Sequence, residues 1–316
     1  MGFVLSERTG WLKNFLLRVE ASLIATATEF DNDETLRVSD YLAQSKSAAE
    51  WANKILSPHS ACYFTQTKVP DDNGPVRLLE LVDHPNNLIQ LTGHDFTVWR
   101  TPHPKYKTIL NGIRRGSLGT TSENANFLPP NSDAYEHHTE LITRSLDIIR
   151  SQLPSYYRFI STYLKSATLV DRNASFRAST TYYARGMTFF SPLDSWTLFT
   201  WFEELIHEAT HNFSFALMTF DSLMTGEDSF KLKIRGPFRE DLRHLYGIFQ
   251  ALLVISRIME AYKSLSIEHI EPKFVKNRMD YFLSNTSEQF ELLKKEGNFT
   301  AIGKEIFENE IVPTFS

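Results

Sequence analysis

The chain has 316 residues, of which 42% are apolar and 13% aromatic, so it has the composition of a globular protein rather than a disordered one. Its formal net charge of -5 argues against a nucleic-acid-binding protein, which would carry a basic excess. Cys62 is the single cysteine, so no internal disulfide can form, which indicates either a reducing compartment or a protein that does not depend on cysteine.

The sequence shows no segment that would anchor it in a membrane or direct it to secretion. No window reaches the roughly eighteen uninterrupted apolar residues of a spanning helix. The first residues, MGFVLSERTGWLKNFLL, lack the basic start and the small-residue cleavage site of a secretion signal. We therefore expect a cytoplasmic protein that does not bind a membrane.

The N-terminal region, residues 1–134, is predicted to combine helices with a small sheet. Apolar residues recur at helical spacing over residues 10–30, and a second helical stretch covers residues 36–56. The stretch VRLLELVDHPNNLIQLTGHDFTVWR alternates short apolar runs with turn residues, which predicts a small antiparallel meander. Residues 101–134 are rich in Pro, Gly, Ser, Thr and Asn and are interpreted as a long loop or a linker.

The second predicted region, residues 135–316, is dominated by helices. A helical pattern over residues 135–165 is interrupted at Pro154, and two or three strands are predicted in ATLVDRNASFRASTTYYARGMTFFSP. Further helices are predicted over residues 194–220, 239–264 and 271–311. This order of elements predicts an α+β fold that is predominantly helical, with small antiparallel sheets.

The stretch EELIHEATHNF, residues 203–213, contains the motif HExxH. Residues four apart on a helix project from the same face, so His207 and His211 can direct both imidazoles at a single ion. Glu208 lies roughly one hundred degrees further round the axis, where it can reach a water held by the metal but not easily the metal itself. This is the geometry of the general base in HExxH metal sites.

The surroundings of the motif favour a metal site over two histidines that are satisfied by neighbours in a helical core. The motif lies in a long apolar helix, where an unpaired buried polar group costs about 1–3 kcal/mol, so the imidazoles need polar partners or a metal. The helix also follows GMTFFS, a predicted strand. In metallopeptidases with this motif, an edge strand before the helix holds extended substrate by backbone pairing.

A catalytic metal normally has a third protein ligand, which the motif does not supply. A metzincin has a histidine six residues after the second motif histidine, and that position is Leu217, so the chain is not a metzincin. A gluzincin takes a glutamate from a following helix, and Glu260 or Glu240 is available for this role. The downstream candidates are Glu227, Asp228, Glu240, His244, Gln250, Glu260 and His269.

Four segments between residues 140 and 262 carry a family resemblance: LDIIRSQLPSYYRFISTYLKSATLV, GMTFFSP, EELIHEATHN and GPFREDLRHLYGIFQALLVISRI. They resemble the HExxH-motif peptide-modification family, which includes iron(II)- and 2-oxoglutarate-dependent peptide β-hydroxylases with a gluzincin-like fold. Its members show a Pro-aromatic-Arg-x-Asp-x-Arg-Pro-Leu-x-Gly-x-x-His run in the last segment. The residues that fit are Pro237, Phe238, Arg239, Asp241, Arg243, Leu245 and Gly247. His244 stands where proline is usual, and Gln250 stands where the liganding histidine is expected.

The resemblance implies a gluzincin-like metal-binding core and an Fe(II)- and 2-oxoglutarate-dependent oxygenase that hydroxylates a peptide or a small amino-acid-like substrate. His207 and His211 would then bind the iron, and Glu208 would orient what the iron binds. Gln250 would be a weak third contact, because neutral oxygen is a poor ligand for iron(II) or zinc, or would hold a metal-bound water.

A stripe of residues on the predicted helix 240–264 suggests how the co-substrate is held. Its members at helical spacing are Arg243, Gly247, Gln250, Val254 and Arg257. An arginine fork matches the distal carboxylate that 2-oxoglutarate leaves free, and Arg243 is the first choice for it, with Arg239 the second. His244 lies about one hundred degrees off the stripe and ranks below Gln250 as a ligand.

Two other functions remain open at this point. A zinc metallopeptidase would use Glu208 as its general base, because zinc lowers the pKa of a bound water to roughly 7. A catalytically inactive relative would keep the fold and bind a peptide, and the glutamine at position 250 is its best support. The sequence leaves the substrate and the oligomeric state open.

Overall fold

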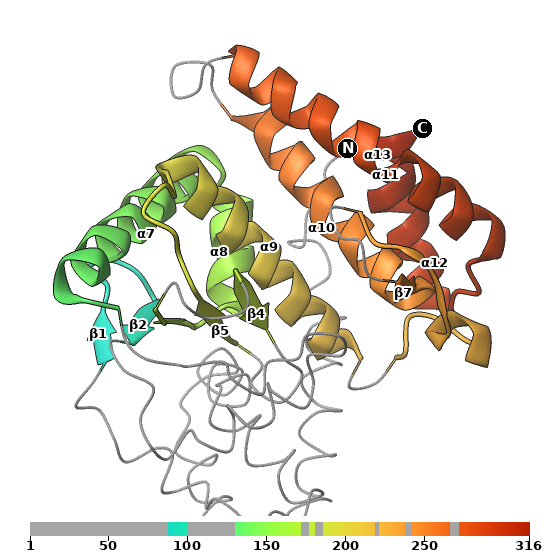
Figure 1. The fold of residues 1–316 in the computed structure, drawn as a ribbon, viewed down its shortest axis with the longest axis horizontal. Coiled ribbons are helices and arrows are strands. Elements are labelled where there is room, and N and C mark those ends of the chain that lie inside the picture. The colour runs from blue at the N-terminus through green and yellow to red at the C-terminus, as the bar shows by residue number, and fades with distance from the viewer. Residues whose placement is uncertain are drawn as a thin grey trace, which may run out of the picture. The chain divides into compact units, whose positions relative to one another are not determined.

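A computed structural model describes residues 88–99, 130–171, 177–180, 186–218, 221–237, 242–265 and 272–316 (Figure 1). Within these residues the protein is predominantly helical with small sheets, which confirms the α+β prediction. The helices predicted over residues 10–30 and 36–56 lie outside the described residues. The predicted domain boundary after residue 134 stays a prediction.

The described residues divide into two compact units. One, called here the helical unit, contains residues 144–158 and 197–316. The other, called the sheet unit, contains the described residues up to 143 and residues 159–196. Helices α7 (Ser132–Gln152) and α8 (Pro154–Tyr163) each contribute to both units. Leu153 separates the two helices and Pro154 begins the second, which confirms the predicted break.

The sheet unit is built on one sheet of five short strands. In spatial order the strands are β1 (Leu88–Gln90), β2 (Thr97–Trp99), β3 (Ser166–Leu169), β5 (Met187–Phe190) and β4 (Ala178–Thr180). The two outer pairs are antiparallel, whereas β3 pairs in parallel with both β2 and β5. Every residue of β3 and β5 is buried, as is usual where parallel strands are covered on both faces.

Two features of this sheet differ from the sequence predictions. The strands near residues 88–99 and 166–190 were predicted as separate antiparallel sheets, but β2 joins them into a single mixed sheet through its pairing with β3. Strand β5, the GMTFFS segment, is paired on both sides, so it is not an edge strand. The edge beside it is formed by β4.

The helical unit is centred on α9 (Leu198–Leu217) and α10 (Leu245–Ser264), which pack against each other. Thr197 and Thr200 form a reciprocal capping box that fixes where α9 begins. Fourteen residues of α9 are buried, which confirms the apolar helix predicted over residues 194–220. Helix α10 is long and apolar enough to cross a membrane by composition, but 83% of its 18-residue window is buried inside the protein, as in a core helix.

Helix α10 begins later than the sequence predicts. Residues Leu242–His244 form strand β7, which pairs with β6 (Leu232–Arg235) in an antiparallel hairpin. The His244 side chain then caps α10 by accepting a hydrogen bond from the Gly247 backbone N–H at 2.8 Å. The predicted helix start near residue 240 was therefore wrong. Apolar spacing does not reveal a histidine cap or a two-stranded hairpin.

The C-terminal part of the helical unit covers α10. Helix α11 (Pro272–Glu296) lies beside α10 and runs in the opposite direction (Figure 1). In the chain, the 3-10 helix η5 (Glu227–Phe230) comes between α9 and β6. The last three elements are α12 (Ala301–Ile306), the π-helix η6 (Phe307–Ile311) and α13 (Val312–Phe315). A Cβ atom on Gly303 would lie 1.8 Å from the carbonyl oxygen of Leu223, so glycine allows α12 to approach the loop after α9.

Candidate metal centre

Helix α9 brings the two motif histidines together. The Nε2 atoms of His207 and His211 lie 3.1 Å apart, and the ring centroids are separated by 4.8 Å at an interplanar angle of 62°. Both side chains are only partly buried, and that of His207 is 40% exposed. The two rings therefore share one environment on an accessible stretch of α9, as the spacing of four predicts.

This separation fits a shared divalent cation. A tetrahedral ion bound at about 2.0–2.1 Å holds two nitrogens roughly 3.3–3.4 Å apart, and an ion with right-angled ligands holds them about 3.0 Å apart. Without an ion, one neutral ring can donate its N–H to the bare nitrogen of the other.

Glu208 stands beside the imidazole pair. Its carboxylate oxygen Oε1 lies 3.8 Å from the Nε2 atom of His207, and its side chain is almost fully buried at 4% exposed. This distance is too long for a direct hydrogen bond. A carboxylate in this position can act on a group held by the histidines and is the proton acceptor that hydrolysis would need.

The histidines belong to a stripe of residues at spacings of four along α9. Its members are Phe199, Glu203, His207, His211 and Phe215. The Phe215 ring is stacked against His211, with centroids 6.4 Å apart and an interplanar angle of 23°. The candidate metal ligands therefore have an aromatic ring one turn beyond them and a carboxylate one turn before them.

Gln250, predicted as a weak third contact, is buried on α10. Its amide nitrogen donates to the hydroxyl of Tyr246 at 2.7 Å, and that hydroxyl donates to the sulfur of Met218 at 2.6 Å. Burial raises the pKa of Tyr246, which keeps the hydroxyl protonated as a donor. Gln250 is thus held by the preceding turn of its own helix, and its role at a metal stays a prediction.

Arg243 and His244 do not occupy the helical positions assigned to them. Arg243 lies on β7, so the predicted stripe on α10 contains only Gly247, Gln250, Val254 and Arg257. The Nδ1 atom of His244 is used to cap α10. Burial, followed by the charge of Arg243, lowers the pKa of His244, so the ring stays neutral and accepts this hydrogen bond.

The structure describes some of the other candidates for a third ligand, and neither Glu260 nor Glu227 belongs to a metal-binding group among the described residues. The carboxylate of Glu260 accepts a hydrogen bond at 3.1 Å from Tyr156, whose hydroxyl also donates to the Arg257 carbonyl. Glu227 is exposed on η5. The described residues hold no group of three or more His, Cys, Asp or Glu side chains that is placed to bind a metal. Among the predicted site residues and ligand candidates, three lie outside the described residues: Arg239, Glu240 and His269.

A buried ionic cluster next to the histidines was not predicted. Glu203, one turn before His207, accepts two hydrogen bonds of 2.6 Å from the guanidinium of Arg278 and one of 2.7 Å from Tyr262. The fork from Glu203 raises the pKa of Arg278, and burial raises that of Tyr262. The only signal in the sequence was a glutamate in an apolar helix, because Arg278 is distant in the chain.

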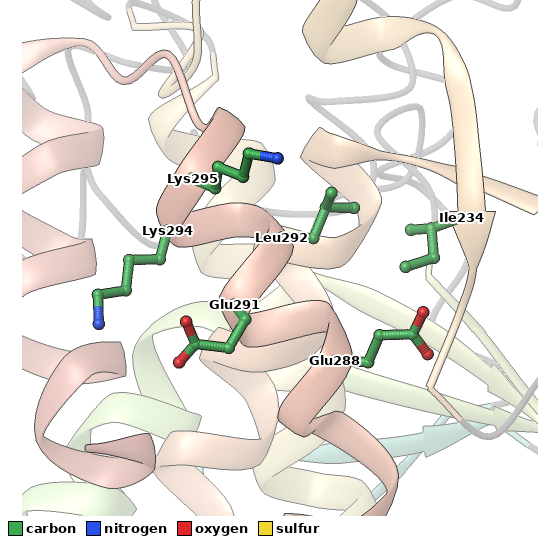
Figure 2. Close-up of a pocket in the computed structure, with 6 residues that line it drawn as sticks. All are labelled: Ile234, Glu288, Glu291, Leu292, Lys294 and Lys295. Atoms are coloured by element: carbon green, nitrogen blue, oxygen red, sulfur yellow. The ribbon is translucent and has the colours of Figure 1, made fainter.

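A shallow pocket of about 550 Å³ lies elsewhere in the helical unit, between β6 and α11. Figure 2 shows Ile234 on the strand, with Leu292 and Glu288 extending from the helix towards it. The remaining lining residues are Glu291, Lys294 and Lys295. None of the predicted site residues lines this pocket, so the candidate metal centre is a stretch of helix surface rather than this cavity.

No protein-family model matches the chain, and no curated protein matches it.

Proposed function

We propose that the protein is an Fe(II)- and 2-oxoglutarate-dependent oxygenase that hydroxylates a peptide or amino-acid side chain, with a gluzincin-like core and a cytoplasmic location. The observation that carries the metal assignment is the approach of the His207 and His211 Nε2 atoms to 3.1 Å. The choice of reaction rests on the resemblance of the segments around Pro237 and Gly247 to the peptide β-hydroxylases.

In this proposal iron(II) and 2-oxoglutarate supply the activation of dioxygen. The chain holds the ion through its two imidazoles and presents the Glu208 carboxylate beside them to orient groups or to accept a proton. Gln250 would be a weak third contact through its amide oxygen or would position a metal-bound water. Arg243 or Arg239 would hold the distal carboxylate of 2-oxoglutarate through a guanidinium fork.

A zinc metallopeptidase is the second candidate, and one observation favours it. The buried Glu208 carboxylate lies 3.8 Å from the His207 nitrogen, beside the position where hydrolysis would need a base. A general base next to a metal is required for hydrolysis, whereas an oxygenase does not need one. Zinc would lower the pKa of a bound water to about 7.

The two candidates separate by metal content and by product. Purified protein would be loaded with iron(II) without oxygen, given 2-oxoglutarate and a peptide library, and assayed for succinate after oxygen is admitted. We expect succinate release that is lost in His207→Ala and His211→Ala and kept in His137→Ala, which replaces an exposed histidine of α7. Peptide cleavage by the zinc form, lost in Glu208→Gln, would instead establish the peptidase. Metal binding with neither product would contradict both.

A further inference from the structure

We infer that an aromatic and guanidinium surface on α11 and the start of α9 docks an extended peptide whose neighbouring residue reaches the two histidines. This surface, called here the aromatic patch, consists of Phe199, Phe274, Arg278 and Tyr281. The inference specifies which peptides the candidate metal centre would accept, and it rests on the proposed function.

Two members of the aromatic patch are exposed although they are large aromatic residues, and the other two are partly buried. Phe274 is 39% and Tyr281 is 45% exposed, and they stand two turns apart on one side of α11. The Phe274 ring packs on Phe199 at 5.4 Å between centroids and edge-on to Tyr262 at 6.3 Å. Exposed aromatic rings next to an arginine are typical of binding surfaces, where they supply apolar area and a fixed hydrogen-bond donor.

Arg278 is held rigidly at the centre of the patch. Its Nε and Nη2 atoms donate to Glu203, while the guanidinium lies 5.2 Å from the Tyr281 ring centroid and 4.5 Å from that of Phe282. The side chain is nevertheless 29% exposed, and Nη1 takes no part in the fork with Glu203. Because Glu203 already balances the charge, a neutral carbonyl of a peptide backbone matches the remaining N–H donors better than a second carboxylate.

The patch extends towards the candidate metal centre over Arg278, whose guanidinium covers the buried Glu203 one turn before His207. Phe199, Glu203 and His207 follow one another at spacings of four, so each lies one turn from the next. At about 1.5 Å per residue, Phe199 lies about 12 Å from His207 along the helix axis. An extended peptide advances about 3.3–3.4 Å per residue, so it spans this distance in about four residues. The substrate is therefore expected to carry an aromatic or large apolar side chain about four residues from the one at the metal.

Probes of known geometry test this spacing. They are Gly/Ser decapeptides with one phenylalanine placed one to eight residues from a metal-chelating hydroxamate, which is attached at either end in two separate series. Their affinity for the zinc-loaded full chain would be measured by fluorescence anisotropy. We expect the tightest binding at a spacing of about four residues. We expect a loss of about tenfold in Phe274→Ala at this spacing. Tyr281 lies two turns further along α11, so Tyr281→Ala should cost less and at every spacing, and Tyr281→Phe, which keeps the ring, should bind as the wild type does.

Leu283→Ala is the matched control, because Leu283 is also an exposed apolar residue of α11, at 37%, but faces away from the patch. It should leave the affinity unchanged, and thermal melting shows that each variant is folded. Equal affinity at every phenylalanine position, or equal losses in all three alanine variants, would overturn the inference. A fall in oligomeric mass of the Phe274→Ala variant without loss of peptide affinity would also overturn it, since the patch would then join two copies of the chain.

The same titrations keep the two claims apart. If the hydroxamate contributes to affinity but the phenylalanine does not, the docking surface is wrong and the metal centre stands. If the phenylalanine contributes and is lost in Phe274→Ala, while the hydroxamate contributes nothing with or without zinc, the patch docks a peptide and the proposed function fails.

Discussion

Replacing Glu310 with alanine is expected to lower the free energy of unfolding by about 3–5 kcal/mol. Glu310, on the π-helix η6, accepts hydrogen bonds of 2.7 and 3.0 Å from Arg257 of α10, and both side chains are only 6% exposed. The guanidinium also stacks over Phe213 of α9 at 4.3 Å. Removing the carboxylate leaves a buried positive charge between the helices, which is the costly way to break such a pair.

Urea unfolding followed by far-UV circular dichroism measures this loss. The double variant Arg257→Met with Glu310→Leu removes both charges and keeps apolar volume, so its stability should return to within about 1 kcal/mol of the wild type. The same reasoning predicts a somewhat smaller loss in Arg278→Ala, because the Glu203 carboxylate that it leaves behind is 8% exposed but keeps the hydrogen bond from Tyr262. A loss below about 1 kcal/mol in Glu310→Ala would refute the reasoning.

Three further outcomes are expected. Burial, followed by the charge of His137, lowers the pKa of His138 to about 4. The unfolded chain therefore binds a proton at His138 below about pH 6.5, whereas the folded chain binds it only below about pH 4. As the pH falls through this window, the free energy of unfolding should decrease by about 2–3 kcal/mol. Urea titrations at several pH values measure this decrease, which should be smaller in His138→Leu. Gly303→Ala should lower the melting temperature, because its methyl group meets the Leu223 carbonyl and α12 must shift; an unchanged melting temperature would show that α12 lies further away. Glu208→Gln should keep the bound metal and abolish peptide hydrolysis, whereas hydroxylation, which needs no general base, should be weakened but not lost; metal analysis beside the product assay measures both.

Local features of the fold could be predicted from the sequence. Apolar spacing identified α9 and the bulk of α10, and Pro154 marked the break between α7 and α8. The approach of His207 to His211 follows from helical geometry alone, since residues four apart share a face. Each of these features depends on residues within about one or two turns of one another.

Features that depend on distant partners could not be predicted. The pairing of β2 with β3 merges two predicted sheets, and the sequence of neither strand indicates which strand it will pair with. The β6–β7 hairpin moved Arg243 off α10, because tertiary pairing overrode a helical pattern. The contact of Glu203 with Arg278 joins α9 to α11 and has no local signature. Any third metal ligand would likewise come from elsewhere in the chain, which is why spacing left Gln250, His244 and the glutamates as alternatives.

The central claim is that His207 and His211 hold one divalent cation between them. Cobalt(II) titration of the full chain, followed by visible absorption of the ion, tests it directly because nitrogen ligands change the intensity and position of its bands. We expect saturation at one equivalent, with the signal abolished in His207→Ala and in His211→Ala and retained in His137→Ala. An unchanged titration in the two α9 variants, or no signal in the wild type, would contradict the account.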